Sequence, residues 1–164
     1  MCPADMAVGK SGLMEASVII PADETNLIRA ATIHSISWQE SHRAFCTPEF
    51  IELHTPERQL EYLRSKMNCG TKIYMLVDES PAGIVSVTGS LIEDLYVLPE
   101  KQNMGYGTKL LQYAIDHCAD TPTLWILENN LRAEKLYCRM GFQKTGRRNA
   151  ITSELDEIEF ALKK

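Results

Sequence analysis

The sequence predicts a single mixed α/β domain, and three features of the chain support this fold class. The length of 164 residues is enough for one domain to bury a hydrophobic core. Two apolar segments, 72–77 and 82–88, flank a turn-forming Asp-Glu-Ser-Pro sequence, which is typical of an antiparallel hairpin. Residues 90–127 read as strand, helix and strand, which predicts two parallel strands joined by a right-handed crossover. We therefore expect one sheet with both antiparallel and parallel neighbours.

Composition narrows the class of protein further. Hydrophobic residues make up 45% of the chain and charged residues 24%, which is ordinary for a soluble globular protein. The five cysteines are widely spaced with no C-x-x-C pair, so we expect reduced thiols rather than a zinc site or disulfides. No signal-peptide h-region or run of eighteen apolar residues is present. These features predict a cytoplasmic protein that binds neither a metal nor a membrane.

The charge distribution is uneven along the chain. The formal net charge of -5 argues against nucleic acid as a partner. Residues 97–148 nevertheless contain eight Lys or Arg and only five Asp or Glu. This segment is therefore the basic part of an acidic protein, although scattered surface charge explains so small an excess equally well.

The first half of the chain begins with small, polar, unpatterned residues 1–15, which we interpret as a mobile leader before one domain over residues 16–164. Residues 16–20 read as a short strand. Asp23 or Thr25 is expected to cap a helix that reaches about residue 41. Its apolar stripe contains Leu27, Ala30, Ala31, His34 and Trp38, and we interpret His34 as a packed or rim residue rather than a catalytic one.

Two Thr-Pro-Glu sequences mark the next helix starts. Thr47 and Thr55 suit the N-cap, with Pro in the first helical position and Glu near the positive end of the dipole. The second helix has Leu60, Leu63 and Met67 on one face, and Gly70 lies just beyond its end.

In the second half we expect a helix over residues 105–118 and a buried strand over 124–127. A short helix should follow Asn130 and stop at Gly141, where glycine suits a left-handed end. Residues 142–145 and 158–162 are predicted as the last strands.

The segment Gln-Asn-Met-Gly-Tyr-Gly at residues 102–107 connects a strand to a helix. Such a turn presents free backbone N–H groups and the positive end of the helix dipole, which suits a phosphate group. It is not a dinucleotide fingerprint, because the third glycine position holds Leu110. Taken alone, the turn also fits an ordinary helix start.

A second segment makes the first more specific. The pattern N-x-x-A-x-x-x-Y-x-x-x-G-F runs over residues 130–142, and Q-x-x-G-x-G runs over residues 102–107. Together they resemble the GNAT superfamily of acyl-CoA-dependent N-acyltransferases, specifically over residues 82–142 and loosely elsewhere. This resemblance implies a mostly antiparallel sheet of about six to seven strands, with a splayed parallel pair and helices on both faces.

The resemblance also implies acetyl-CoA as co-substrate and assigns residues to it. The pyrophosphate would bind backbone N–H groups of the glycine turn, and the pantetheine arm would pair with the exposed edge of the strand before it. The implied coenzyme-binding residues are Leu95, Tyr96, Val97, Gln102, Asn103, Met104, Gly105, Tyr106, Gly107, Thr108, Asn130 and Ala133. The N–H of Val97 or a neighbour would stabilise the developing oxyanion.

Two side chains would carry protons. Tyr137 matches the family's general acid, with Phe142 packed on its turn, and a core tyrosine is the structural alternative. Glu93 matches the base that some members carry, acting directly or through water, and a solvated strand-end carboxylate is its alternative. A period of two puts Glu93 on one face with Leu95 and Val97, and Asp94 on the other.

The sequence thus predicts direct acetyl transfer to a primary amine in a ternary complex. Cys138 adjoins Tyr137 but faces away from its helical stripe, so no nucleophilic cysteine is expected. The rival is a non-catalytic acyl-CoA-binding or sensing module, which would need neither Tyr137 nor Glu93. The acceptor, small molecule or peptide, stays open, with Trp38, Glu40 and His42 as residues that could face it, and so does a homodimer.

Overall fold

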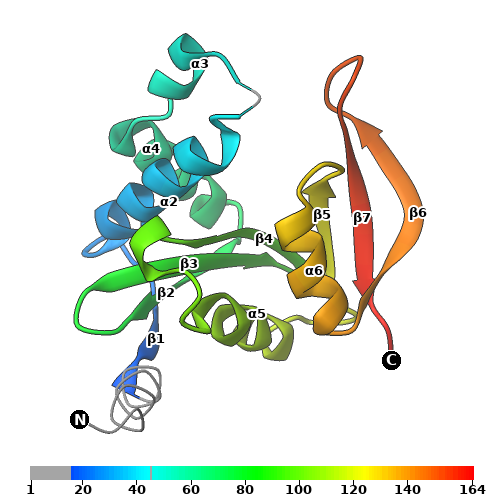
Figure 1. The fold of residues 1–164 in the computed structure, drawn as a ribbon. Helices are drawn as coiled ribbons and strands as arrows, with labels where there is room; N and C mark the ends of the chain where they lie inside the picture. Colours follow the sequence, from blue (N-terminus) through cyan, green and yellow to red (C-terminus); the bar gives the residue numbers. More distant parts are fainter. Residues whose placement is uncertain (1–15, 45) are drawn as a thin grey trace, which may run out of the picture.

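The computed structural model describes residues 16–44 and 46–164, which form a seven-stranded sheet with helices on both faces (Figure 1). The leader predicted over residues 1–15 lies outside the described residues. The strands are β1 (Val18–Pro21), β2 (Lys72–Val77), β3 (Pro81–Thr88), β4 (Leu91–Val97), β5 (Thr123–Leu127), β6 (Phe142–Ala150) and β7 (Asp156–Leu162). The helices are α2 (Leu27–His42), α3 (Pro48–Glu52), α4 (Pro56–Asn68), α5 (Tyr106–Asp116) and α6 (Leu131–Arg139), with a 3₁₀ turn at Pro99–Lys101.

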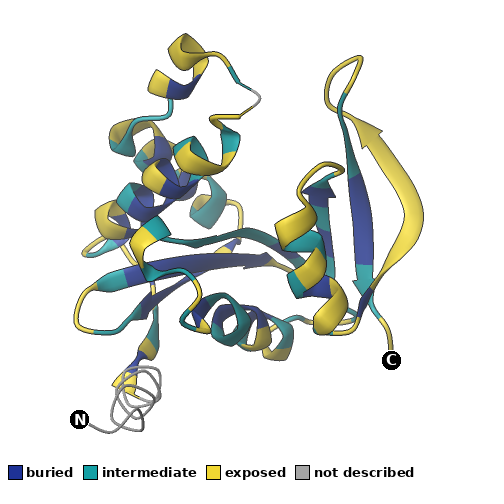
Figure 2. Ribbon diagram, viewed as in Figure 1, coloured by how far each residue is buried: buried dark blue, intermediate teal, exposed yellow. Residues whose placement is uncertain are grey.

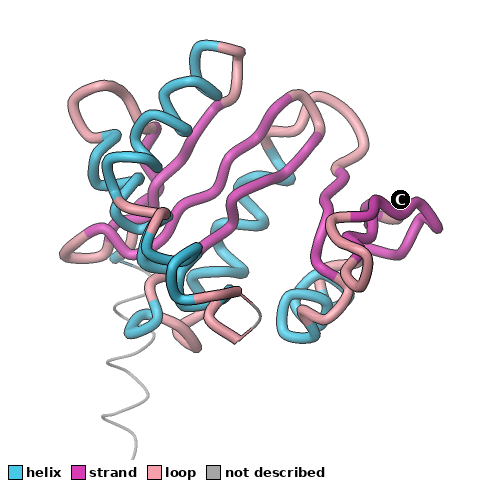
Figure 3. Tube along the Cα trace, turned by 90° about the horizontal axis from the view of Figure 1, so that it is seen from above, coloured by secondary structure: helices cyan, strands magenta, loops and turns pink. Residues whose placement is uncertain are grey.

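The sheet order is β1-β2-β3-β4-β5-β7-β6, and β4 with β5 is the parallel pair among otherwise antiparallel neighbours of the described chain. This arrangement confirms the predicted fold class. The ladder between β4 and β5 joins Leu91 to Thr123 and Ile92 to Leu124 and goes no further. Beyond it, β5 to β7 diverge from β2 to β4, as the view from above shows (Figure 3). The predicted splay of the parallel pair is therefore confirmed.

Local sequence explains where the early helices begin. The hydroxyl oxygens of Thr47 and Thr55 accept hydrogen bonds from the third backbone N–H that follows each, at 3.3 Å in both cases. Both predicted N-caps are therefore confirmed. Helix α2 begins slightly later than predicted, because the Asp23 carboxylate accepts from the N–H of Thr25 at 2.8 Å and holds a turn, leaving Asn26 as the N-cap.

Two apolar cores lie on opposite faces of the sheet. Helices α2 and α4 cover one face with the buried side chains of Leu27 and Leu63. Helices α5 and α6 cover the other with Leu110, Leu111 and Tyr137. The buried residues follow these two layers, whereas β6 at the sheet edge is almost entirely exposed (Figure 2). The edge position also explains why β6 extends well beyond the predicted residues 142–145: a solvated strand needs no apolar alternation.

A β-bulge in β4 decides where its carboxylates point. Ser86 pairs with Glu93 and Ile84 pairs with Tyr96, so two residues of β4 oppose one residue of β3. Asp94 takes the left-handed conformation at φ 49°, which the short polar side chain of Asp tolerates. The prediction that Glu93 shares a face with Leu95, and that Asp94 points the other way, is wrong. Both carboxylates lie on the side of α4, because the bulge interrupts the alternation.

Candidate active site

The N-terminus of α5 has the features of an anion site. Gly105 is the N-cap in the left-handed conformation (φ 84°), no side chain caps the helix, and its first turn contains no acidic residue. The first backbone hydrogen bond of α5 is donated by the N–H of Lys109 to the carbonyl of Gly105 at 3.0 Å. The preceding N–H groups of Tyr106, Gly107 and Thr108 have no acceptor within the described chain. They are therefore available to a phosphate group.

Glycine at position 107 is not required by packing inside the protein. A Cβ built there would meet only the Cδ2 of Leu136, at 3.6 Å, which is ordinary van der Waals contact. A glycine at this position leaves the backbone open to close approach by a ligand. The backbone rather than the side chain of Tyr106 is offered to a ligand, because its ring is 1% exposed and its hydroxyl donates to Asp78 at 3.0 Å.

Two arginines of α6, which the sequence analysis did not single out, border the same turn. The Arg132 guanidinium donates to the side-chain oxygens of Gln102 and Asn103, and Arg139 donates to the hydroxyl of Thr108 at 3.1 Å. They add two positive charges beside the free N–H groups. The sequence signal that could have identified them is their spacing of seven residues, which places both arginines on one face of a helix.

The edge of β4 leads into this turn. Residues 95–97 have no partner in β5, and the Gln102 amide donates to the carbonyl of Val97 at 3.2 Å. Gly83 of β3 lies against this strand end, where a Cβ would come within 2.9 Å of the carbonyl oxygen of Tyr96. Leu95, Val97 and Met104 pack on the core under α5. The structure thus brings the predicted strand edge and the predicted turn together.

Tyr137 lies in the interior of α6 and packs edge-on against Phe142, with ring centroids 5.9 Å apart. Burial raises the pKa of Tyr137 well above its ordinary value, so the phenol keeps its proton at neutral pH. Asn130 and Ala133 hold the start of this helix, since the Asn130 side chain accepts from the Ala133 N–H at 3.2 Å. Cys138 is exposed.

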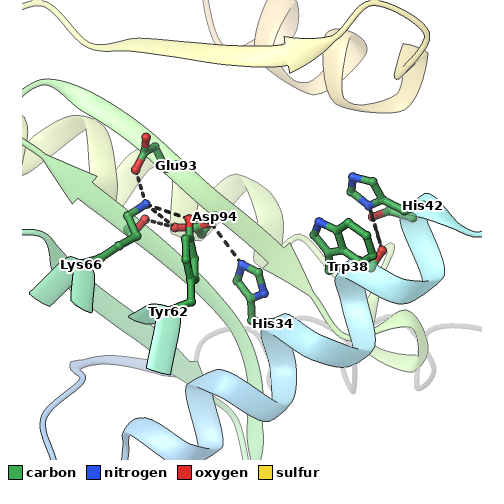
Figure 4. Close-up of polar contacts among 9 residues, drawn as sticks. His34, Trp38, His42, Tyr62, Lys66, Glu93 and Asp94 are labelled. Carbon is green, nitrogen blue, oxygen red and sulfur yellow. Dashed lines mark hydrogen bonds and ion pairs between the residues drawn. The ribbon is translucent and has the colours of Figure 1, made fainter. Parts of the chain in front are cut away.

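On the opposite face of the sheet, Lys66 of α4 links both carboxylates of β4 (Figure 4). Its ammonium contacts Glu93, donates to Asp94 at 2.8 Å and donates to the hydroxyl of Tyr62 at 3.2 Å. Burial alone would lower the pKa of Lys66, but the charge and hydrogen bonds of Asp94 and Glu93 raise it above its ordinary value. Glu93 uses one carboxylate oxygen for Lys66, and its other oxygen accepts no hydrogen bond within the described chain.

His34 of α2 is paired with Asp94. Its Nε2 lies 3.2 Å from the Oδ1 of Asp94, and the ring is 4% exposed. Burial acts to raise the pKa of Asp94, but the hydrogen bond from His34 and the charge of Lys66 outweigh it and hold that pKa below its usual range. Because an ionised carboxylate only accepts hydrogen bonds, Nε2 carries the proton and donates it. Of the two predicted alternatives, packed or rim, the structure shows His34 packed, but its polar pairing with Asp94 was not predicted.

A cavity of about 290 Å³ opens beside this pair, between α2, α4 and β4. It is lined by His34, Trp38, His54, Gln59, Tyr62, Asp94 and Tyr96, and we call it the ring-lined pocket. Of the residues expected to face an acceptor, Trp38 lines the pocket, and the His42 ring stacks on the Trp38 ring with centroids 4.0 Å apart. Glu40 instead forms an exposed pair with Arg43.

Other classes of site find no support in the described ranges 16–44 and 46–164. No group of three or more His, Cys, Asp or Glu side chains in these ranges is arranged to hold a metal ion. No helix of these ranges has both the length and the apolar character needed to cross a bilayer.

A sheet opened between two parallel strands, with the free strand edge leading into an uncapped helix N-terminus, is the arrangement expected from the resemblance to acyl-CoA-dependent N-acyltransferases. The family model described as "Acetyltransferase (GNAT) family" matches residues 30–142, more than half of the sequence. The chain therefore belongs to the GNAT acetyltransferase family, which uses acetyl-CoA as co-substrate. The family predicted from the two sequence motifs is confirmed.

Individual relatives are more distant. Peptidyl-lysine N-acetyltransferase YjaB of Salmonella typhimurium is 31% identical over 80 residues, which cover 49% of this chain and 51% of that protein. The chain thus matches about half the length of this curated relative.

Solved structures agree on the fold. The solution structure of apo-form YjaB from Escherichia coli has a TM-score of 0.66 at 19% identity, covering 88% of this chain and 96% of that one. The PaiA N-acetyltransferase of Thermoplasma acidophilum in complex with coenzyme A has a TM-score of 0.64 at 18% identity, covering 87% and 97%. At these identities the likeness establishes the fold.

Proposed function

We propose that the chain transfers the acetyl group of acetyl-CoA to a primary amine by direct attack in a ternary complex. The observation that carries this proposal is the continuous path from the unpaired edge of β4, through the Gln102 hydrogen bond to Val97, to the uncapped N-terminus of α5. An extended amide chain can pair with the first part of this path, and a pyrophosphate can bind at its end.

The residues along the path would hold the coenzyme. The N–H groups of Tyr106, Gly107 and Thr108 would bind the pyrophosphate, with Arg132 and Arg139 adding charge at its rim. Bound acetyl-CoA supplies a thioester whose carbonyl carbon is open to attack by an amine. A backbone N–H of residues 95–97 would stabilise the oxyanion that forms as the amine adds.

Tyr137 suits the role of acid. Its pKa is raised by burial, and no described residue accepts or donates a hydrogen bond at its hydroxyl. A protonated phenol near the departing thiolate can donate its proton as the carbon–sulfur bond breaks. Phe142 restricts the ring by edge-on packing. Asn130 contributes by capping the helix that carries Tyr137.

Glu93 is the proposed base, directly or through one water. An alkyl amine of pKa about 10.4 is neutral in about one molecule in 2,500 at pH 7, which corresponds to about 4.6 kcal/mol before attack begins. The carboxylate of Glu93 has a free oxygen toward solvent, and its side chain is 34% exposed. Removing a proton from the ammonium recovers part of that free energy.

The charge distribution of the chain and the name of the matched YjaB protein both support a cationic amine as the acceptor. Outside residues 97–148 the chain contains 17 acidic side chains and nine basic ones, which favours a cationic acceptor. The matched YjaB protein is named for peptidyl-lysine, so a lysine side chain in a peptide belongs beside small amines among the candidates.

A thiol-release assay with acetyl-CoA and a panel of amines tests the proposal. The panel contains lysine peptides, linear monoamines and linear diamines, and we expect turnover of at least one of them. Calorimetry measures coenzyme binding in parallel. Tight binding of acetyl-CoA without turnover of any amine would overturn the enzyme assignment and support the rival binding or sensing module.

A further inference from the structure

The ring-lined pocket contains a buried nitrogen with no hydrogen-bond partner. His34 donates its Nε2 proton to Asp94, and in the neutral ring its Nδ1 carries a lone pair. This Nδ1 atom is buried and has no hydrogen-bond partner among the described residues. The His34 side chain as a whole is only 5% exposed. A buried acceptor left without a donor is costly, which indicates that a donor arrives from a ligand.

From this we infer that the ring-lined pocket binds a second, non-reacting ammonium group of the acceptor, with the Nδ1 of His34 as its hydrogen-bond acceptor. The inference rests on the proposed function and names a chemical class within it: linear diamines, or a primary amine with another protonated nitrogen a few carbons away. Asp94 acts as a positioning residue, because it fixes the tautomer of His34.

Asp94 cannot take the ligand's proton donor itself. Its Oδ1 accepts from His34 and from the hydroxyl of Tyr62, and its Oδ2 accepts from Lys66 and from the hydroxyl of Ser86 at 2.7 Å. Four donors saturate the carboxylate. The incoming N–H therefore turns to the free nitrogen of His34.

A second imidazole, that of His54, lines the same cavity. The Nδ1 of His54 lies 3.0 Å from the carbonyl of Phe50, which only accepts, so Nδ1 carries a proton, and in the neutral ring Nε2 carries the lone pair. The His54 ring stacks on Trp38 with centroids 3.5 Å apart. Among the described residues, no Lys or Arg side chain lines the pocket. Two lone pairs and several π-faces suit an ammonium group.

The adjoining charges favour a cation as well. Glu93 and Asp94 carry two negative charges, and Lys66 is the one ammonium bound to both. These three side chains therefore have a formal net charge of -1, which attracts an additional positive charge.

The nitrogen that binds in this pocket is distinct from the reacting one. A site built from lone pairs and π-faces stabilises a protonated amine, and a protonated amine cannot attack a thioester. Glu93, the proposed base, lies on the same side of β4 as the pocket, because Lys66 of α4 contacts both Glu93 and Asp94. The reacting nitrogen would lie at Glu93 and the ammonium in the pocket, so a short linker separates the two nitrogens.

Steady-state kinetics with linear diamines of three to six carbons, each compared with the monoamine of equal length, test this inference. We expect kcat/KM to favour the best diamine over its monoamine at least tenfold in the unmodified protein. His34→Gln keeps an amide donor toward Asp94 and removes Nδ1. It should lower kcat/KM for the diamine at least tenfold, mainly through KM, and change the monoamine value less than twofold.

Ser86→Ala is the matched control, because it removes one donor from Asp94 and does not line the pocket. We expect the ratio of diamine to monoamine to stay within twofold of the unmodified protein. An equal loss for both amines in His34→Gln, an equal drop of the ratio in Ser86→Ala, or no diamine preference at the start would each overturn the inference. If no amine is turned over, the proposed function fails, and calorimetric titration of the diamine into the unmodified and His34→Gln proteins still decides on the pocket.

Discussion

Asp94→Asn removes the charge at the centre of the polar cluster on β4 and keeps the shape of the side chain. The carboxylate accepts four hydrogen bonds, from His34, Tyr62, Lys66 and Ser86. An amide retains one acceptor oxygen, and its NH₂ group must face two of those donors. The side chain is 10% exposed, so water cannot replace the lost partners.

The loss of free energy can be estimated from these contacts. A hydrogen bond to a charged group contributes about 1.5 to 3 kcal/mol, and breaking a buried ion pair by removing one partner costs about 3 to 5 kcal/mol. We therefore expect Asp94→Asn to lower the free energy of unfolding at pH 7 by about 3 kcal/mol. For a chain of this size, that corresponds to a fall in Tm of about 6 to 12 °C.

The pH dependence separates a charge effect from a packing effect. The pKa of Asp94 is lower in the folded than in the unfolded state, so its contribution is present above the unfolded pKa and is lost as the pH falls through the folded pKa. With an unfolded pKa of about 3.9, the difference between the two proteins should shrink by about 1.3 kcal/mol between pH 7 and pH 3.

Urea denaturation followed by circular dichroism at both pH values measures these differences. Asp116→Asn, at an exposed position near the end of α5, is the control and should change the free energy of unfolding by less than about 0.5 kcal/mol. A difference for Asp94→Asn below 1 kcal/mol at pH 7, or one that is the same at both pH values, would refute the reasoning.

Three further predictions concern the coenzyme side of the sheet. Gly83→Ala should lower the free energy of unfolding, measured by urea denaturation, by about 2 to 3 kcal/mol, because the added Cβ meets a backbone carbonyl oxygen at 2.9 Å. Gly107→Ala should change the free energy of unfolding by less than about 0.5 kcal/mol, because its Cβ meets no close neighbour. The same variant should weaken coenzyme binding, measured by calorimetry, at least tenfold. Equal stability losses in the two variants would contradict the assignment of Gly107 to the ligand. Tyr137→Phe should lower turnover in the thiol-release assay at least tenfold with coenzyme affinity within a few-fold, and unchanged turnover would remove it as the acid. Asn130→Ala should lower the free energy of unfolding by about 1 kcal/mol, because it removes the N-cap of α6. The control Asn129→Ala should not lower it, because the Asn129 side chain does not cap this helix. A similar loss in both variants would show that capping is not the cause.

Much of the fold was readable from the sequence because its signals are local. Thr47, Thr55 and Gly141 act at helix ends within a few residues of chain, and each takes the position that its chemistry predicts. The glycine turn and the later helix were readable as a pair of motifs, and they proved to be neighbours in space through Arg132 and Arg139.

The arrangement of the carboxylates was not readable, because a bulge depends on the partner strand. Nothing in residues 91–97 themselves says that two of them will oppose one residue of β3. The same holds for His34 and Lys66, which reach β4 from two helices far away in sequence. The sequence did contain a signal: His34 is a polar residue in an apolar helical stripe, and a buried polar side chain needs a polar partner.

The two-residue ladder between β4 and β5 has a consequence for how the domain folds. The sheet consists of two blocks, β1 to β4 and β5 to β7, and each block contains antiparallel neighbours only. Joining them closes a long crossover, while few strand hydrogen bonds are gained, so the apolar layer of α5 and α6 must hold the blocks together. A molecule bound between the blocks stabilises the joined state alone, by about 2.7 kcal/mol at a concentration of one hundred times its Kd. With the donor substrate bound along the proposed path between the blocks, loading with that substrate and completing the fold would be linked events.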